Sequence, residues 1–209
     1  MFTDREDAGK KLASRLEEYR GNNAVVLALP RGGVVLGYEV AKALGFPLDI
    51  IATRKIGHPM HPEYAIGAID EKGMRILNEM EVAATDPTWL AKESERQRKE
   101  AERRVMLYRG GRVPVALAGK VVILVDDGIA TGLSMRLAQR TTKAQRPKKV
   151  IIAVPVAPPE SVATLRAEGA DDVMVIEAPE EFLGTVGAHY LQFDQVGDDV
   201  VINLLRISK

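Results

Sequence analysis

The chain has 209 residues, of which 46% are hydrophobic and 28% are charged, and 29 basic side chains balance 29 acidic ones. This length predicts one domain with its own core, while the balanced charge argues against a general nucleic-acid binder, which needs a basic excess to neutralise phosphates. The absence of cysteine excludes disulfides, thiolate metal sites and a cysteine nucleophile.

The first 20 residues are charged throughout and lack the apolar segment of a secretory signal peptide. No uninterrupted apolar run in the chain approaches the roughly 20 residues of a membrane span, so we expect a cytoplasmic protein without membrane contact. Ala8, Leu12, Leu16 and Tyr19 recur at helical spacing. They predict a helix over residues 5–20 that ends at Gly21.

Short apolar runs then alternate with helical stretches. Strands are predicted at 24–29, 47–53, 121–125, 150–154 and 172–177, and helices at 33–44, 131–145 and 158–169. Runs of four to six aliphatic residues are typical of parallel strands that are covered on both faces. The alternation therefore predicts an α/β fold, with a doubly wound, mostly parallel sheet and helices on both faces.

The middle of the chain interrupts this alternation. Glycine and proline separate short strand-like pieces within residues 56–84, which we interpret as a hairpin and a candidate lid. Asp86-Pro87 predicts the start of a helix, and its mixed charges over 92–104 favour a solvated helix over a basic binding arm.

We therefore expect a single domain over residues 1–209. Its parts would be a core at about 20–178, a hairpin and helical insertion at about 56–110, and a C-terminal hood at about 179–209 that includes a last helix near 199–205.

The segment Val121–Gly132 carries the strongest chemical signal. A buried strand ends in Asp126 and Asp127, and a glycine-rich turn then opens into a helix. Backbone N–H groups and a helix N-terminus favour a phosphate, whereas the two carboxylates suit sugar hydroxyls or a divalent cation. A phosphorylated ribose with a bound metal ion would account for both the phosphate-binding turn and the two carboxylates. The alternative is a capped strand–turn–helix with two solvated aspartates.

Residues 122–132 resemble the phosphoribosyl diphosphate (PRPP) signature of the type I phosphoribosyltransferases. The resemblance implies that Asp126 and Asp127 bind the ribose hydroxyls. It also implies that Mg²⁺ binds mainly through PRPP, with these two carboxylates as further ligands. The residues implied to surround the 5′-phosphate are Gly128, Ile129, Ala130, Thr131 and Gly132.

Two further segments fit this resemblance. Pro30-Arg31-Gly32-Gly33 follows the first predicted strand, where the family has its diphosphate loop, and Arg54-Lys55 closes the second. The expected diphosphate ligands are Arg31, Gly32, Gly33, Arg54 and Lys55. An ordinary turn and a pair of solvated cations are the alternatives. We expect all three segments to meet at one edge of the sheet, with Asp126, Asp127, Arg31 and Lys55 as the catalytic set.

The resemblance implies a Mg²⁺-dependent transfer of 5-phosphoribose from PRPP to a nitrogen nucleophile such as a nucleobase, with release of diphosphate. The sequence departs from the hypoxanthine–guanine enzymes at Ala130, where they carry an aspartate. Glu63 is a possible substitute base, or a plain surface residue. Phe182 and Tyr190 could stack on an acceptor, or could pack against the sheet.

The alternative function is a regulatory protein that senses PRPP or a nucleotide without turnover. In either case the expected partners are small molecules, PRPP and a nucleobase-like acceptor, with no nucleic acid or membrane; a homodimer is possible, as the family often pairs. His58 and His61 are interpreted as loop histidines because a third metal ligand is lacking. Asp127→Asn is expected to weaken PRPP binding with little change in melting temperature.

Overall fold

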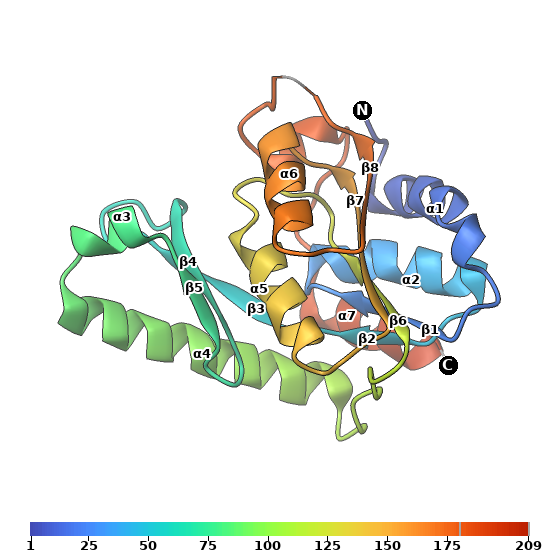
Figure 1. Cartoon of the computed structure of the whole chain (residues 1–209), viewed down its shortest axis with the longest axis horizontal. Helices are drawn as coiled ribbons and strands as arrows, with labels where there is room; N and C mark the ends of the chain where they lie inside the picture. Colours follow the sequence, from blue (N-terminus) through green and yellow to red (C-terminus); the bar gives the residue numbers. More distant parts are fainter. Residues whose placement is uncertain (180, 209) are drawn as a thin grey trace.

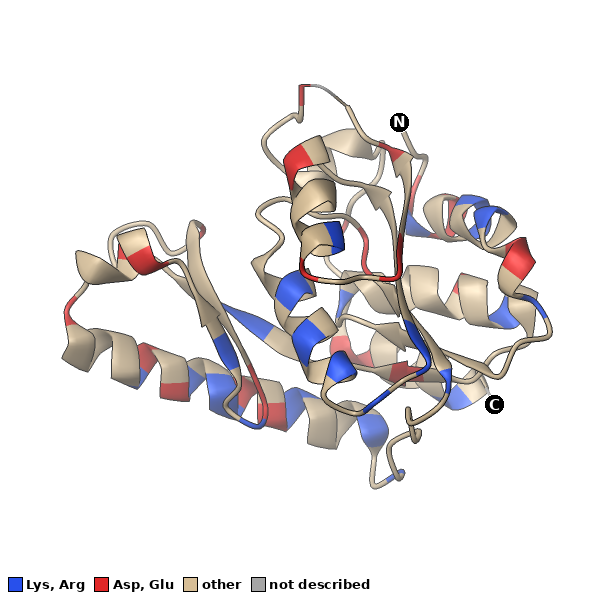
Figure 2. Cartoon of the chain, viewed as in Figure 1, with Lys and Arg blue, Asp and Glu red and all other residues tan. Residues whose placement is uncertain are grey.

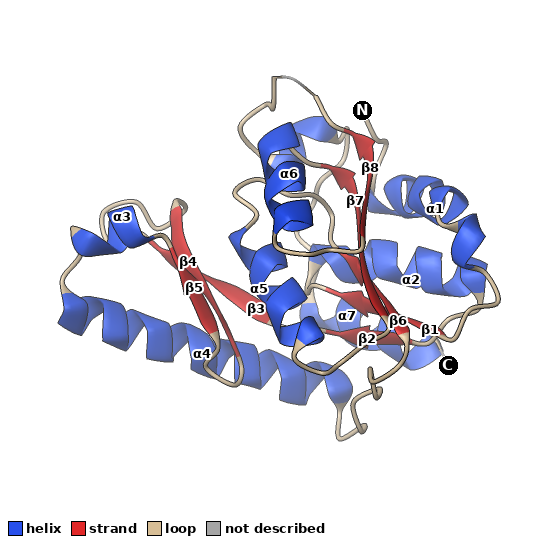
Figure 3. Cartoon of the chain, viewed as in Figure 1, coloured by secondary structure: helices blue, strands red, loops and turns tan. Residues whose placement is uncertain are grey.

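A five-stranded parallel sheet forms the centre of the molecule (Figures 1 and 3). The computed structural model describes residues 1–179 and 181–208. The strands, in spatial order, are β2 (Leu48–Ile50), β1 (Ala24–Ala28), β6 (Val121–Val125), β7 (Lys149–Val156) and β8 (Asp172–Glu177). The α/β fold with a mostly parallel sheet is thus confirmed.

Alternate residues of each central strand enter two separate cores. Val26 and Ile123 face the first core, while Val25 and Leu124 face the second. The helices of the first core include α1 (Arg5–Arg15), α2 (Gly32–Leu44) and α7 (Asp198–Ile207), and those of the second include α5 (Leu133–Lys143) and α6 (Pro159–Ala167). Because both faces are covered, the strands are apolar at consecutive positions.

A small antiparallel sheet and a long helix form an arm that projects from this body (Figure 1). The elements of the arm are β3 (Thr53–Gly57), β4 (Ala65–Asp70), β5 (Arg75–Leu77), α3 (Glu79–Ala83) and α4 (Pro87–Arg109). Ile66 packs toward Trp89 of α4, whereas Ala68 packs toward Leu137 of α5. The arm sheet therefore lies between these two helices.

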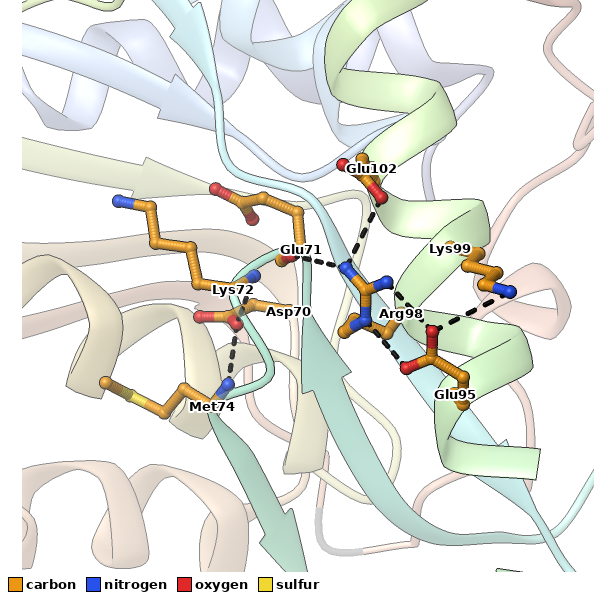
Figure 4. A network of polar contacts seen from close by, with 8 residues as sticks. All are labelled: Asp70, Glu71, Lys72, Met74, Glu95, Arg98, Lys99 and Glu102. Atoms are coloured by element: carbon orange, nitrogen blue, oxygen red, sulfur yellow. Dashed lines mark hydrogen bonds and ion pairs between the residues drawn. The ribbon is translucent and has the colours of Figure 1, made fainter. Parts of the chain in front are cut away.

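The turn between β4 and β5 is tied to α4 by polar contacts (Figure 4). Asp70 Oδ1 accepts hydrogen bonds from the backbone N–H groups of Lys72 and Met74, at 2.9 and 2.8 Å. Arg98 on α4 pairs with Glu95 and donates to the carbonyl oxygen of Glu71. Acidic and basic residues are interspersed along α4 after its first, uncharged turn, as expected where one face of a helix meets solvent (Figure 2).

Two predicted elements differ in the structure. The expected strand over 47–53 divides into β2 and β3, because the chain leaves the parallel sheet at Ile51 and Ala52 and then pairs with β4 in the opposite direction. The expected helix over 5–20 ends at Arg15, followed by a short 3₁₀ turn, η1 (Glu17–Tyr19).

The N-terminus and the C-terminal tail together cover one end of the sheet. Phe2 forms a β-bridge with Tyr190, just after the 3₁₀ turn η2 (Val186–His189). Its backbone N–H donates to the carbonyl of His189, and its own carbonyl accepts from Leu191, both at 2.9 Å. Among the described residues, no helix has both the length and the apolarity needed to cross a membrane.

Candidate active site

Two loops lie side by side at the carboxyl ends of β1 and β6. These strands are neighbours in the sheet, and the backbone N–H of Leu29 donates to the carbonyl of Val125 at 2.9 Å. The Pro30–Gly33 loop therefore runs against the Asp126–Gly132 loop. Ligands of parallel sheets bind at this edge, so the predicted convergence of these two segments is observed.

The glycines of the first loop allow this close approach. A Cβ on Gly33 would lie 2.8 Å from the carbonyl oxygen of Val125 and 2.9 Å from Cα of Asp126. A Cβ on Gly32 would overlap the carboxylate of Asp127. Any larger residue would separate the two loops, so Gly32 and Gly33 are required for their contact.

The second loop opens into α5 and borders a cavity of about 260 Å³. Gly132, in the left-handed region at φ +76°, is the N-cap of this helix. The carbonyl of Ala130 accepts from the Ser161 hydroxyl at 3.2 Å, and the N–H of Ile129 donates to the carbonyl of Val156 at 2.9 Å. The cavity lining includes Lys55, Asp126, Val186 and all five residues from Gly128 to Gly132.

The two adjacent carboxylates have different surroundings. Asp126 lines the cavity, and its Oδ1 accepts the N–H of Asp127 at 2.9 Å. Asp127 turns away and pairs with Arg5 of α1, with 2.8 Å between Oδ2 and Nε. Burial, followed by the charge of Asp127, raises the pKa of Asp126 well above its usual range. Burial also raises the pKa of Asp127, and Arg5 opposes this effect.

The alternation of β3 places its two cations on opposite sides of the strand. Lys55 lines the cavity, and its Nζ pairs with Glu63 of the loop between β3 and β4 at 2.6 Å. Arg54 faces α4, where its Nε donates to Gln97 Oε1 at 3.1 Å. Burial, then the charge of Arg104, lowers the pKa of Arg54. The expectation that both cations face the same site is therefore not met for Arg54.

Arg31 also turns toward the helices rather than the cavity. Its Nη1 lies 3.6 Å from Asp198 Oδ1 at the start of α7, and Asp198 accepts a hydrogen bond of 2.6 Å from the Tyr108 hydroxyl of α4. Among the described residues, the cavity lining includes neither Arg31 nor Arg54. Arg31 is directed to α7 and Arg54 to α4, so neither charge points into the cavity.

The aromatic side chains of the tail pack inside the protein and are not exposed to the cavity. Tyr190 is buried, its ring lies 5.4 Å from that of Phe2, and its hydroxyl donates to the carbonyl of Asp127 at 2.5 Å. Phe182 is half-buried with its ring 4.9 Å from His189. These placements match the alternative in which the aromatic residues pack against the sheet. Of the tail residues that the structure describes, Val186 lines the cavity.

Arg5 and Val186 belong to the site although the sequence does not single them out. Arg5 is one of several charged residues in the first turns of α1, and Val186 lies in an irregular tail. His58 and His61 stack with ring centroids 5.7 Å apart in the β3–β4 loop. In the described part of the chain, no group of three or more His, Cys, Asp or Glu residues could hold a metal ion.

Comparison with known proteins identifies relatives over almost the whole chain. A family described as "Phosphoribosyl transferase domain" matches residues 3–190. A Mycobacterium tuberculosis protein named as a candidate phosphoribosyl transferase is 42% identical over 207 residues, which are 98% of this chain and 46% of that protein. The chain thus spans about half the length of the curated relatives it matches.

Solved structures extend the comparison. The protein TT1426 from Thermus thermophilus is 43% identical, covers 98% of this chain and 97% of its own, and superposes with a TM-score of 0.79. A hypothetical protein from Neisseria gonorrhoeae with bound ppGpp is 14% identical, covers 100% of this chain and 99% of its own, and has a TM-score of 0.50. At that identity the second structure shows a likeness of fold alone.

Proposed function

This chain belongs to the phosphoribosyl transferase domain family, and from that premise we propose that it transfers 5-phosphoribose from PRPP to a nucleobase-like nitrogen nucleophile. One observation carries the proposal: Asp126, Lys55 and the Gly128–Gly132 loop line one cavity at the carboxyl edge of the sheet. A carboxylate, a cation and a phosphate-binding turn are the three kinds of group that a phosphorylated, activated sugar requires.

The 5′-phosphate would bind at the Gly128–Gly132 loop. Ala130 and Thr131 are exposed there, so the hydroxyl of Thr131 and backbone N–H groups at the start of α5 are available to phosphate oxygens. The ribose hydroxyls would then donate hydrogen bonds to Asp126. This places the negative phosphate at the helix N-terminus and keeps the carboxylate on the uncharged part of the substrate.

The diphosphate would bind between the Pro30–Gly33 loop and Lys55. Gly32 and Gly33 let this loop approach Asp126 closely, and Lys55 supplies a positive charge on the cavity side of β3. Lys55 is paired with Glu63, whose side chain is 95% exposed, so a phosphate can replace Glu63 at little cost in buried surface. Arg31 and Arg54 would attract the diphosphate through their electrostatic field and would not contact it.

The protein's own residues would hold Mg²⁺ only when the phosphates of the bound substrate supply further ligands. No described cluster of three or more ligating side chains exists, but Asp126 lines the cavity where the diphosphate would lie. Mg²⁺ is commonly held by one or two carboxylates and substrate phosphates. When bound, the ion would neutralise charge that develops on the departing diphosphate.

In the reaction, the acceptor nitrogen forms a bond to C1 of the ribose while the bond from C1 to the diphosphate oxygen breaks. The diphosphate leaves with the bonding electron pair, and positive charge develops on the sugar, as in glycoside hydrolysis. This chain's residues orient the sugar and stabilise the leaving anion. The candidate lid, residues 56–84, would exclude water; its loop from His58 to Tyr64 carries Glu63, which pairs with Lys55 at the cavity.

The test combines a diphosphate-release assay across nucleobases with calorimetric titration of PRPP, both with and without Mg²⁺. The wild type should bind PRPP and release diphosphate with at least one base. Asp126→Asn should lower turnover at least a hundredfold while the fold is retained, and Asp199→Asn, an exposed carboxylate on α7, should have no effect. Absence of PRPP binding by the wild type would contradict the proposal.

A second candidate function is a sensor that binds PRPP or a nucleotide without turnover. Ala130 favours it, because this position offers no acidic group to the cavity. Glu63, the possible substitute base, is exposed and paired with Lys55. Tight Mg²⁺-dependent binding with no diphosphate release for any acceptor would select the sensor.

A further inference from the structure

The N-terminal helix places a buried cation directly behind the site. Arg5 is the first residue of α1, far in sequence from the loops, and its Nε donates to Asp127 Oδ2 at 2.8 Å. The side chains of Arg5 and Asp127 are only 12% and 16% exposed. A buried ion pair adds little to the stability of the fold, because the free-energy cost of removing both charges from water offsets their mutual attraction.

The C-terminal tail fixes the guanidinium in one orientation. Nη1 of Arg5 donates to the carbonyl of Asp194 at 2.7 Å, and its Cζ lies 3.7 Å from the centroid of the Phe193 ring. Tyr190 donates to the carbonyl of Asp127 from the same tail. A planar guanidinium that is both stacked and hydrogen-bonded in two directions has little rotational freedom.

Asp127 in turn contacts the other loop of the site. A Cβ on Gly32 would overlap Asp127 Oδ2 and would lie 2.9 Å from Arg5 Nε. The paired carboxylate therefore lies directly over the backbone of the Pro30–Gly33 loop. Arg5, Asp127 and Gly32 form a chain of contacts from the tail to the loop assigned to the diphosphate.

We propose that Arg5 is a positioning residue that, through Asp127, holds the Pro30–Gly33 loop against the Asp126–Gly132 loop. The pair keeps Asp127 out of the cavity and leaves Asp126 as the carboxylate that meets the ribose. This inference rests on the proposed function for its effect on PRPP. Its effect on the two loops can be measured without any substrate.

The first measurement compares Arg5→Lys and Arg5→Gln with Lys10→Gln, whose side chain is 65% exposed on the same helix. Lysine keeps the charge but cannot reproduce two directed bonds and the ring stacking. We expect Arg5→Lys to weaken PRPP binding about tenfold, with a melting temperature close to that of the wild type. Lys10→Gln should change neither quantity.

A double-mutant cycle separates positioning from general destabilisation. If Arg5 acts through Asp127, Arg5→Gln should weaken PRPP binding strongly in the wild type and add almost nothing in the Asp127→Asn background. The double variant also removes both buried charges together, so it should fold better than Arg5→Gln alone. Additive effects on PRPP affinity would overturn the inference.

Hydrogen exchange without ligand tests the same inference independently of the function. In Arg5→Lys, amides of residues 31–34 and 127–132 should exchange faster, while those of β7 should not change. If the wild type fails to bind PRPP, the proposed function falls and the exchange data still decide the role of Arg5. Unchanged exchange in both loops would overturn that role even in an active enzyme.

Discussion

Neighbouring residues of the same type acquire different roles from their surroundings. Asp126 and Asp127 are consecutive, yet one lines the cavity and the other pairs with Arg5. The expectation that Asp127→Asn leaves the melting temperature almost unchanged therefore needs revision, because the substitution leaves Arg5 buried and without its carboxylate. Breaking a buried pair is strongly destabilising, so loss of stability is expected beside loss of binding.

Glu71 provides a test of burial on a single carboxylate outside the site. It follows β4 in the turn shown in Figure 4, and its Oε2 is buried without a hydrogen-bond partner among the described residues. Burial raises the pKa of Glu71 above its ordinary value of 4.5. The folded state then binds the proton more tightly than the unfolded state, so this carboxylate lowers the stability as pH rises above 4.5.

We predict that the unfolding free energy of Glu71→Gln increases relative to that of the wild type as pH rises. Glutamine does not titrate, so the variant lacks the ionisation that costs the wild type free energy at neutral pH. Urea denaturation at about pH 4 and pH 7 gives the difference in unfolding free energy. Glu18→Gln, at an exposed glutamate, is the control. If the difference in unfolding free energy between Glu71→Gln and the wild type is the same at both pH values, the prediction is wrong.

At the scale of elements, close packing of two loops and the alternation of one strand shape the site. The strand period of two places Lys55 at the cavity and Arg54 against α4. Arg54 and Lys55 are consecutive, so the sequence predicts one shared site for them, whereas the pleat of the strand separates the two side chains. Residues 47–53 form one apolar run, so the sequence does not mark the break between β2 and β3; the break arises because β3 leaves the parallel sheet and pairs with β4 in a separate antiparallel sheet.

Gly33→Ala tests the contact between the loops. The added methyl would lie 2.8 Å from the carbonyl oxygen of Val125, so the loops must separate. We expect PRPP affinity to fall at least tenfold and stability to fall by about 1–3 kcal/mol. Titration calorimetry and thermal unfolding measure the two effects.

Gly45→Ala is the matched control for this substitution. Gly45 has φ +74° at the end of α2, and among the described residues no heavy atom beyond its chain neighbours lies within 4 Å of the position that an added Cβ would take. Alanine there should cost about 1 kcal/mol through backbone strain without changing PRPP affinity. Equal affinities for the two variants would show that the loop contact is not needed for binding.

At the scale of the whole molecule, the two ends of the chain combine to support the site. Phe2 is 1% exposed and packs on Tyr190, whose hydroxyl donates to the carbonyl of Asp127. Residues nearly the whole chain apart thus cover one end of the sheet. The arm contributes from the other direction through Lys55 and the loop from His58 to Tyr64.

Phe2→Ala should therefore destabilise the whole domain. Removing a fully buried phenylalanine side chain costs about 3–5 kcal/mol, from lost burial and the cavity left behind. Leu191→Ala, on the same tail segment but 69% exposed, should change stability by less than about 0.5 kcal/mol. Chemical denaturation of both variants measures the difference, and a loss for Phe2→Ala as small as that for Leu191→Ala would show that the terminus is not anchored.

Local patterns in the sequence were enough to predict the α/β fold, the strand–turn–helix at Asp126 and the glycine loop after β1, because each is written in consecutive residues: an apolar run, a turn with glycine, a helix start. The directions in which Arg31, Arg54 and Asp127 point became known only from the folded chain. Their partners Asp198, Gln97 and Arg5 lie far away along the chain. Contacts between distant residues depend on how the helices and the tail pack, and no local pattern encodes that packing.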